Sequence, residues 1–275
     1  MPNEEFQPVV PHEGWHVLHL FYQIDHSQWA LYSEDDQRHA KTQLSELVQE
    51  IRSTPDTHLL VYAVVGPKAD LGFMLLTPDL QVANAFEKQL SLSLGPEILI
   101  PTYSYLSQTE GSEYTTTREQ YIEETLIAEK SLDPKSTEFA KALQEFEDRM
   151  AHYRQHRLYP VLPDWPVICF YPMSKRRQGN DNWYSLDYPT RRQLMAGHAK
   201  VGRTYSGRIL QLITGSTGLD EHEWGVTLLA KNTSDIKAIV YEMRFDEVSA
   251  RYGEFGDFYI GLQLPLDALF RRVCL

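Results

Sequence analysis

The stretch HLLVYAVVGPKADLGFMLLTP, residues 58–78, decides the fold. Two apolar runs flank the turn-like residues PKA, a pattern typical of an antiparallel hairpin. The elements expected on either side are a strand at 15–25, a helix from the cap Ser33 to about Arg52, a helix from Asp79 to about Leu94 and a strand at 98–107. The N-terminal order is therefore β, α, β, β, α, β.

The C-terminal part of the chain repeats this order. RILQLITG (208–215) and WGVTLLAK (224–231) predict a second hairpin with an acidic connecting loop. The elements expected around it are a strand at 165–175, a helix from about Thr190 to Val201 closed by Gly202, a helix that begins near the cap Ser234 and a strand at 258–265. Two copies of a split βαβ unit predict an α+β fold with two tandem ferredoxin-like halves, the arrangement of a dimeric α+β barrel in one chain, with antiparallel sheets and helices on the outer face.

The segment between the two copies is polar. TTTREQYIEETLIAEK and KSTEFAKALQEFEDRMAHYRQHR carry many Glu and Lys residues and modest apolar stripes, so we expect helices that add no third core. We assign residues 1–112 to the N-terminal half, 113–160 to a helical linker or insertion, and 161–275 to the C-terminal half.

Composition limits the classes of function. The 275 residues carry a formal charge of -12, which argues against general affinity for nucleic acid or for anionic membranes. No apolar run approaches the roughly 20 residues that cross a bilayer, and the N-terminus lacks the features of a signal peptide, so we expect a cytoplasmic protein. Cys169 and Cys274 lie far apart and predict plain thiols rather than a disulfide or zinc site.

Positive charge gathers in one region of this acidic chain. Between Arg154 and Arg208 there are ten Lys or Arg residues and three acids, which leaves 16 basic and 35 acidic residues elsewhere. Two interpretations stay open: a pocket for a small polyanion, or a solvated face whose cations pair with acidic neighbours.

Three features of the C-terminal half depart from the ordinary pattern: two single residues and one strand. His198 shares a helical stripe with Leu194 and Val201, and Gln211 lies between aliphatic residues on a strand face. Taken singly, a hydrogen-bonded core residue explains either one. The strand VICFYPMSK places Cys169, Tyr171, Met173 and Lys175 on one face. Together, imidazole, amide, tyrosine and a cationic rim suggest a large flat ligand that bears carboxylates, and an iron porphyrin meets that description.

Four long motifs strengthen this interpretation: YPMSKRR, NWYSL, MAGHAKVGRTYSGRILQLITGSTGLDEHEWGVTLLAK and IVYEMRFDEVSARYGEFGDFYIG. They resemble the chlorite dismutase superfamily, specifically its coproheme decarboxylase (hydrogen peroxide-dependent heme synthase) branch. The resemblance is dense from about Arg157 to the C-terminus, and upstream it is mainly one of domain organisation.

The resemblance implies roles for particular residues. His198 would be the proximal axial ligand of the iron, and Gln211 would stand on the distal side, where chlorite dismutases place an arginine. Tyr171 would be the redox-active tyrosine that removes hydrogen from a propionate, with Lys175 as the neighbouring base or charge partner. The other matching positions are Arg157, Met173 and Ser249 near the propionates, Trp183 in the pocket, and Arg244, a further basic position.

The resemblance also implies a reaction. Hydrogen peroxide would drive oxidative decarboxylation of two propionates of iron coproporphyrin III (coproheme) to vinyl groups, giving heme b in heme biosynthesis. Members of the family commonly assemble as pentameric rings, so the resemblance implies a homopentamer, and coproporphyrin ferrochelatase is a candidate donor of the substrate. The alternatives are a heme peroxidase or chlorite-decomposing enzyme on the same fold, and a non-catalytic heme carrier or sensor. Nucleic-acid binding is disfavoured by the charge and by the absence of an RNP-like motif.

Overall fold

A computed structural model describes residues 7–275, and the chain divides into two compact units. One unit joins the residues through Thr109 to Leu162–Leu275, and the other is Glu110–Val161. The elements through Thr109 are β1 His16–Ile24, α1 His26–Trp29, α2 Glu34–Ser53, β2 His58–Val65, β3 Leu71–Thr77, α3 Leu80–Leu92 and β4 Leu99–Thr109. They confirm the predicted order, and Ser33 caps α2 by accepting the N–H of Asp36 at 3.1 Å.

The C-terminal half contains more elements than predicted. They are β5 Val167–Lys175, β6 Arg177–Gln178, β7 Asp181–Asn182, a 3₁₀ turn Trp183–Ser185, α6 Tyr188–Arg203, β8 Ile209–Gly215, β9 Trp224–Ala230, α7 Thr233–Met243, α8 Glu247–Tyr252, β10 Gly253–Phe255, β11 Tyr259–Gln263 and α9 Leu266–Arg272.

Two predicted helix boundaries are wrong. Gly202 does not end its helix, because α6 continues to Arg203 with its C-cap at Thr204. The cap of α7 is Asn232 rather than Ser234, and its side-chain oxygen accepts the N–H of Asp235 at 2.9 Å. The second error arises because Asn and Ser are both good N-caps, so the residue type alone does not choose between Asn232 and Ser234.

All main strands belong to one nine-stranded antiparallel sheet, in the order β10-β5-β11-β2-β3-β1-β4-β8-β9. An additional pairing of β5 with β9 closes eight of the strands into a ring, and β10 extends along the end of β5. The two halves meet through β2 with β11 and β4 with β8. The α+β fold with antiparallel strands is confirmed, with the strands of both halves sharing one sheet.

Aromatic side chains fill the space enclosed by the ring of eight strands. The ring of Phe170 on β5 lies 4.0 Å from His19, 5.4 Å from Tyr105 and 5.8 Å from Phe21, measured between centroids. Because successive side chains of a strand point to opposite faces, the neighbours of Phe170 on β5 point away from this interior. Strand β5 therefore contributes to two separate cores.

We expect Phe170→Ala to lower the free energy of unfolding by about 3–5 kcal/mol, because it empties the centre of the aromatic interior. Chemical denaturation monitored by circular dichroism measures the change. Ile100→Ala on β4, where the side chain is exposed, should change stability by no more than about 0.5 kcal/mol. Equal effects of the two substitutions would contradict this account of the core.

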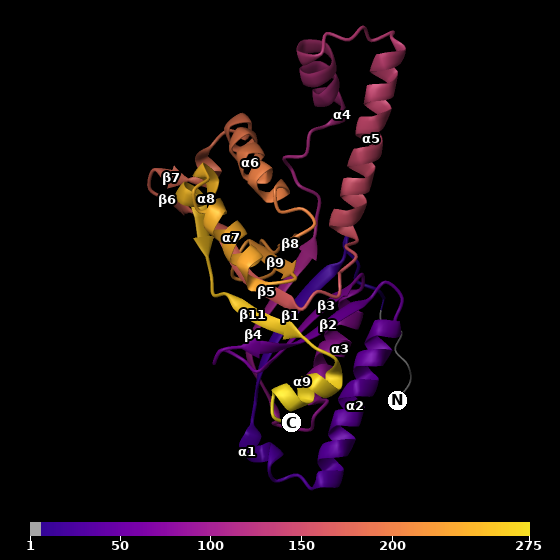
Figure 1. Ribbon diagram of the computed structural model, residues 1–275, viewed down its shortest axis with the longest axis vertical. Coiled ribbons are helices and arrows are strands. Elements are labelled where there is room, and N and C mark those ends of the chain that lie inside the picture. The colour runs from indigo at the N-terminus through magenta and orange to yellow at the C-terminus, as the bar shows by residue number, and fades with distance from the viewer. Residues whose placement is uncertain (1–6) are drawn as a thin grey trace. The chain divides into compact units, whose positions relative to one another are not determined.

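Helices cover the outside of the strands in two groups (Figure 1). Helices α2, α3 and α9 pack on the N-terminal half, around buried residues such as Leu44, Leu90 and Leu269. The other group, α6, α7 and α8, belongs to the C-terminal half. There the buried C-terminal core consists of Val167, Cys169, Tyr171, Tyr205, Ile209, Val226, Leu228, Ala230, Ile236 and Ile239.

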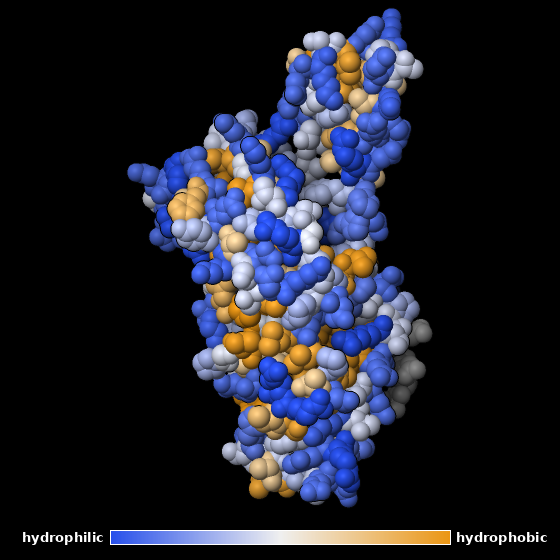
Figure 2. Space-filling model, viewed as in Figure 1, coloured by the Kyte–Doolittle hydropathy of each residue, from blue (hydrophilic) through white to orange (hydrophobic). Residues whose placement is uncertain are grey.

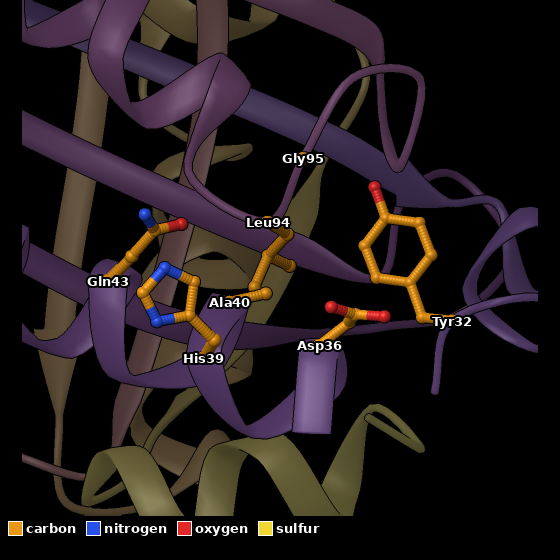
Figure 3. Close-up of a pocket in the computed structure, with 7 residues that line it drawn as sticks. All are labelled: Tyr32, Asp36, His39, Ala40, Gln43, Leu94 and Gly95. Atoms are coloured by element: carbon orange, nitrogen blue, oxygen red, sulfur yellow. The ribbon is translucent and has the colours of Figure 1, made fainter. Parts of the chain in front are cut away.

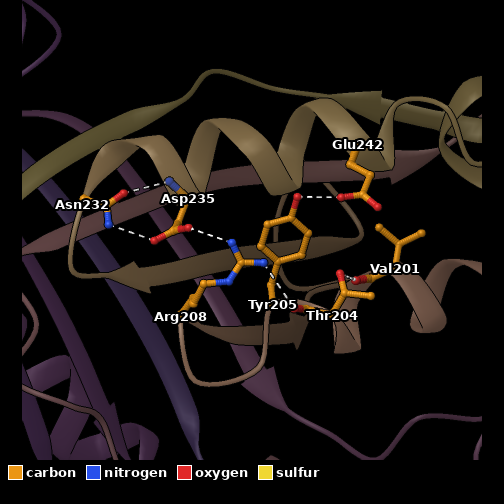
Figure 4. A network of polar contacts seen from close by, with 7 residues as sticks. All are labelled: Val201, Thr204, Tyr205, Arg208, Asn232, Asp235 and Glu242. Atoms are coloured by element: carbon orange, nitrogen blue, oxygen red, sulfur yellow. Dashed lines mark hydrogen bonds and ion pairs between the residues drawn. The ribbon is translucent and has the colours of Figure 1, made fainter.

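Polar contacts tie the end of α6 to α7 (Figure 4). The hydroxyl of Tyr205, just after α6, donates to Oε2 of Glu242 at 2.6 Å. Arg208 donates to Oδ1 of Asp235 at 3.1 Å and to the carbonyl oxygen of Thr204 at 3.2 Å. These contacts anchor one end of α6, the helix that carries His198.

The unit Glu110–Val161 is helical, as predicted. It contains α4 Arg118–Gln120, a π-helix Tyr121–Glu129 and α5 Thr137–Leu158. The rings of Tyr121 and Phe146 stack with centroids 4.0 Å apart and join the two arms of the unit.

Most of the surface visible in Figure 2 is hydrophilic, in keeping with the charge of the chain. Hydrophobic residues gather on this face around β11 and α9, where Leu262, Leu264 and Leu266 are partly exposed. In the described part of the chain, no helix combines the length and the apolar character needed to span a membrane.

Candidate functional site

His198 is held by a carboxylate from another element. Its Nδ1 lies 3.0 Å from Oδ2 of Asp246, a residue in the short connection between α7 and α8. Burial alone would raise the pKa of Asp246, but hydrogen bonds and charge from His198, with hydrogen bonds from Ser249, outweigh it and hold the pKa below its ordinary value. Because the ionised carboxylate accepts a hydrogen bond from Nδ1–H, Nε2 keeps its lone pair for an external electrophile.

The inner stripe of α6 is only half-buried. Leu194, Met195, His198 and Val201 all keep partial exposure, and Gly202 is the one fully buried residue of this helix. By contrast, Ile236 and Ile239 of α7 are buried against the sheet. The prediction that His198 shares a face with Leu194 and Val201 agrees with this pattern, although that face is less enclosed than expected.

Tyr171 lies in the C-terminal core on the same face of β5 as Cys169 and Met173. Its ring stacks on Phe258 at 4.3 Å and lies 5.9 Å from Phe255. Burial raises the pKa of Tyr171, the Cys169 thiol adds to this effect, and the charge of Arg244 opposes it. The phenol is therefore neutral at any physiological pH.

Lys175, at the end of β5, is a buried cation with only 7% of its surface exposed. Its ammonium lies 4.9 Å from the centre of the Trp183 ring. Burial lowers the pKa of Lys175 to about 8, against the opposing attraction of Asp246 and Glu223. Lysine at this position can therefore hold or release a proton near neutral pH.

Gln211 finds its partner in the backbone. Its Nε2 donates to the carbonyl oxygen of Gly202 at 3.0 Å. A side chain at position 202 would crowd this amide, since an added Cβ would lie 3.3 Å from Nε2. The simple hydrogen-bond explanation for a polar residue among Ile209 and Ile213 thus holds in this structure.

The remaining predicted residues of the C-terminal half surround these side chains. Ser249 donates its hydroxyl to Oδ2 of Asp246 at 2.9 Å, and Trp183 lies 5.3 Å from Tyr252 in a T-shaped contact. The guanidinium of Arg244 lies 4.2 Å from the centre of the Phe255 ring, and Met173 packs on the edge of the C-terminal core. Arg157 belongs to the other unit, where its Nε donates to the carbonyl oxygen of Glu110 at 2.8 Å.

Not all three cations of the run point inward, as expected. Lys175 points inward, whereas Arg177 is exposed and Arg176 pairs with Glu254 at 3.5 Å and with Asp181 at 3.8 Å. Most of the basic region is therefore exposed or partly exposed, and Lys175 is its buried member.

The family model for chlorite dismutase matches residues 37–264, which is most of the chain. The chain belongs to the chlorite dismutase family. A solved structure described as a novel heme-binding protein from Thermus thermophilus is 39% identical, with 98% of this chain and 100% of that chain covered and a TM-score of 0.79. An arginine-to-lysine mutant of chlorite dismutase from Candidatus Nitrospira defluvii is 17% identical, with 96% and 97% covered and a TM-score of 0.71. At this lower identity the second likeness concerns the fold.

The predictions from the sequence missed two acids of this chlorite dismutase-family site. The partner of His198 is Asp246, which the sequence patterns did not single out. A signal for it existed, because Asp246 precedes α8 and caps it by accepting the N–H of Ser249 at 3.1 Å. Glu223 gave no such signal, since its contact with β5 spans 48 residues of sequence.

A pocket of about 290 Å³ opens on the N-terminal half of the protein (Figure 3). Its lining consists of Tyr32, Asp36, His39, Ala40, Gln43, Leu94 and Gly95. None of the predicted site residues lines it, so it is separate from the site around His198.

Proposed function

We propose that this protein is a coproheme decarboxylase, which uses hydrogen peroxide to convert two propionates of iron coproporphyrin III to vinyl groups and yields heme b. The observation that carries the proposal is that the C-terminal half holds an imidazole oriented by Asp246, together with a buried tyrosine and a buried lysine on one face of β5. The heme-binding relative at 39% identity supports a porphyrin ligand. The glutamine at position 211, in place of an arginine, argues against chlorite as the substrate.

The residues present suit an iron porphyrin that bears carboxylates. His198 offers Nε2 for the iron, and the half-buried stripe of α6 offers an apolar surface for the ring. Lys175 is a buried cation with no close ion-pair partner among the described residues. Because a buried charge is costly without a counterion, a propionate is a fitting partner for it.

In the proposed reaction, bound iron and hydrogen peroxide supply the oxidising power. Tyr171 gives up an electron and a proton and then takes a hydrogen atom from the propionate carbon next to the ring. Over the whole step each propionate loses two electrons, one proton and carbon dioxide. One hydrogen peroxide takes up the two electrons, that proton and a second proton from solvent, and becomes two waters. Lys175 holds the carboxylate, and the orientation of the ring decides which propionate meets Tyr171.

The direct test is to load the porphyrin-free protein with iron coproporphyrin III without oxygen, add hydrogen peroxide stepwise and follow the pigment by mass spectrometry. We expect a three-propionate intermediate and then loss of a second carboxyl group. Binding followed only by bleaching would refute the decarboxylase and leave a heme carrier or peroxidase. Release of dioxygen from chlorite would instead favour a chlorite-decomposing enzyme.

We expect Asp246→Ala to weaken binding of iron coproporphyrin by about 10–100-fold, because the imidazole of His198 loses the acceptor that orients it. Titration followed by visible absorbance measures the affinity. Asp246 also caps α8, so Asp79→Ala, which removes the cap of α3 in the other half, is the matched control. If both variants bind alike, the carboxylate acts through stability alone.

We expect Lys175→Met to stabilise the porphyrin-free protein at pH 7 by up to about 3 kcal/mol. Folding lowers the pKa of Lys175 from 10.5 to about 8, so the folded state binds fewer protons than the unfolded chain between these values. The stability contributed by this group therefore rises with pH across that window, and the advantage of the variant should vanish above about pH 10.5. Urea denaturation from pH 7 to 10.5 measures it. Lys231→Met, at an exposed lysine that also lies over a tryptophan, should show no such trend.

A further inference from the structure

Glu223 is a buried carboxylate at the end of the loop between β8 and β9, with 7% of its surface exposed. Its Oε2 accepts the backbone N–H of Lys175 at 2.7 Å. Its own N–H donates to the carbonyl oxygen of Met173 at 3.1 Å. Both the side chain and the backbone of Glu223 therefore bind the last residues of β5.

The register of the sheet explains why a side chain is needed here. Met173 pairs with Trp224, which is the first residue of β9, so Lys175 lies beyond the end of that ladder. On the edge of β5 that pairs with β9, the backbone N–H of Lys175 therefore has no strand partner, and Glu223 supplies the acceptor. A neutral oxygen would satisfy the N–H equally well. The N–H alone therefore does not explain why a charged carboxylate is buried at position 223.

The ammonium of Lys175 provides that reason. Glu223 and Asp246 are the two carboxylates whose charges favour the protonated lysine against burial. The other acids around the site already pair with arginines: Asp181 with Arg176 and Arg251, Glu254 with Arg176, and Glu247 with Arg251. Asp246 is in addition hydrogen-bonded to His198. Trp183 faces the ammonium with a neutral ring.

We infer that Glu223 is a positioning residue for Lys175: it fixes the backbone at the end of β5 and places a buried carboxylate next to this buried lysine, so that a cation awaits the substrate carboxylate. Its importance for catalysis rests on the proposed function, whereas the charge relation between the two side chains does not. A neutral amine could not pair with a propionate, so loss of Glu223 would remove the cation at a lower pH than in the wild type.

The first test measures the protonation of Lys175 in the porphyrin-free protein. Lysine labelled with ¹³C at the ε-carbon is titrated by NMR, and the Lys175 signal is identified by its absence in Lys175→Met. Glu223→Gln keeps an oxygen for the backbone N–H but loses the charge, so we expect Lys175 to release its proton at lower pH. Asp220→Asn is the matched control, because Asp220 lies in the same loop and accepts the N–H of Leu106 at 2.9 Å.

An unchanged titration of Lys175 in folded Glu223→Gln, or an equal shift in Asp220→Asn, would overturn the inference. If Glu223→Gln fails to fold, Glu223→Asp replaces it. The shorter side chain withdraws the charge from Lys175, so a smaller shift in the same direction is expected, and no shift would again overturn the inference.

The second test connects Glu223 to turnover. In the decarboxylation assay, the high-pH loss of activity should begin at lower pH in Glu223→Gln than in the wild type, and Asp220→Asn should follow the wild type. A wild type that shows no decarboxylation would remove the proposed function but not the NMR result. An active Glu223→Gln with a wild-type pH profile would contradict the positioning role.

Discussion

Tyr171→Phe is expected to lower the rate of decarboxylation of iron coproporphyrin III by at least about 100-fold, with porphyrin affinity changed by no more than about twofold. The phenyl ring would keep its stacking on Phe258 at 4.3 Å, so the shape of the C-terminal core is preserved. What is lost is the O–H that can release an electron and a proton together. Mass spectrometry of the pigment measures the rate, and visible absorbance measures binding.

Tyr205→Phe is the matched control for this experiment. Tyr205 belongs to the same buried core, but its hydroxyl donates to Glu242 of α7, beside the C-terminal end of α6 (Figure 4). We expect it to lower stability by about 1 kcal/mol and to leave decarboxylation intact. Full turnover by Tyr171→Phe would show that another group carries the electron and would refute the role given to Tyr171.

His198→Ala is expected to remove the ligand of the iron and to weaken binding of iron coproporphyrin by at least about 10-fold. Its Nε2 is the atom left for the metal, because Nδ1 is engaged by Asp246 at 3.0 Å. The visible spectrum of the bound pigment should change in the variant. Added imidazole should restore part of the wild-type spectrum by occupying the space that the side chain leaves.

Metal-free coproporphyrin separates loss of a ligand from loss of the pocket. It has no iron, so His198→Ala should bind it about as well as the wild type does. His39→Ala, in the pocket of the N-terminal half, should behave as the wild type towards both pigments. An unchanged spectrum of the iron compound in His198→Ala would exclude His198 as the ligand.

The sequence by itself determined the features that depend on local periodicity. Strand alternation on β5 separates Phe170 from Tyr171 and puts Lys175 on the same face as Tyr171, because successive side chains of an extended chain point to opposite faces. The cap Ser33 and the first hairpin were predicted for the same reason, since their signals lie within a few residues. The long C-terminal motifs were sufficient to indicate the chlorite dismutase family.

Only the tertiary structure decided which distant residues meet. Asp246 reaches His198 and Glu223 reaches Lys175 across 48 residues in each case, and no local pattern distinguishes them from neighbouring acids such as Glu247. The same holds for the closure of the sheet, because the pairing of β5 with β9 depends on the packing of the whole C-terminal core. Such contacts form where burial makes an unpaired charge or N–H costly, and burial is a property of the assembled fold rather than of a segment.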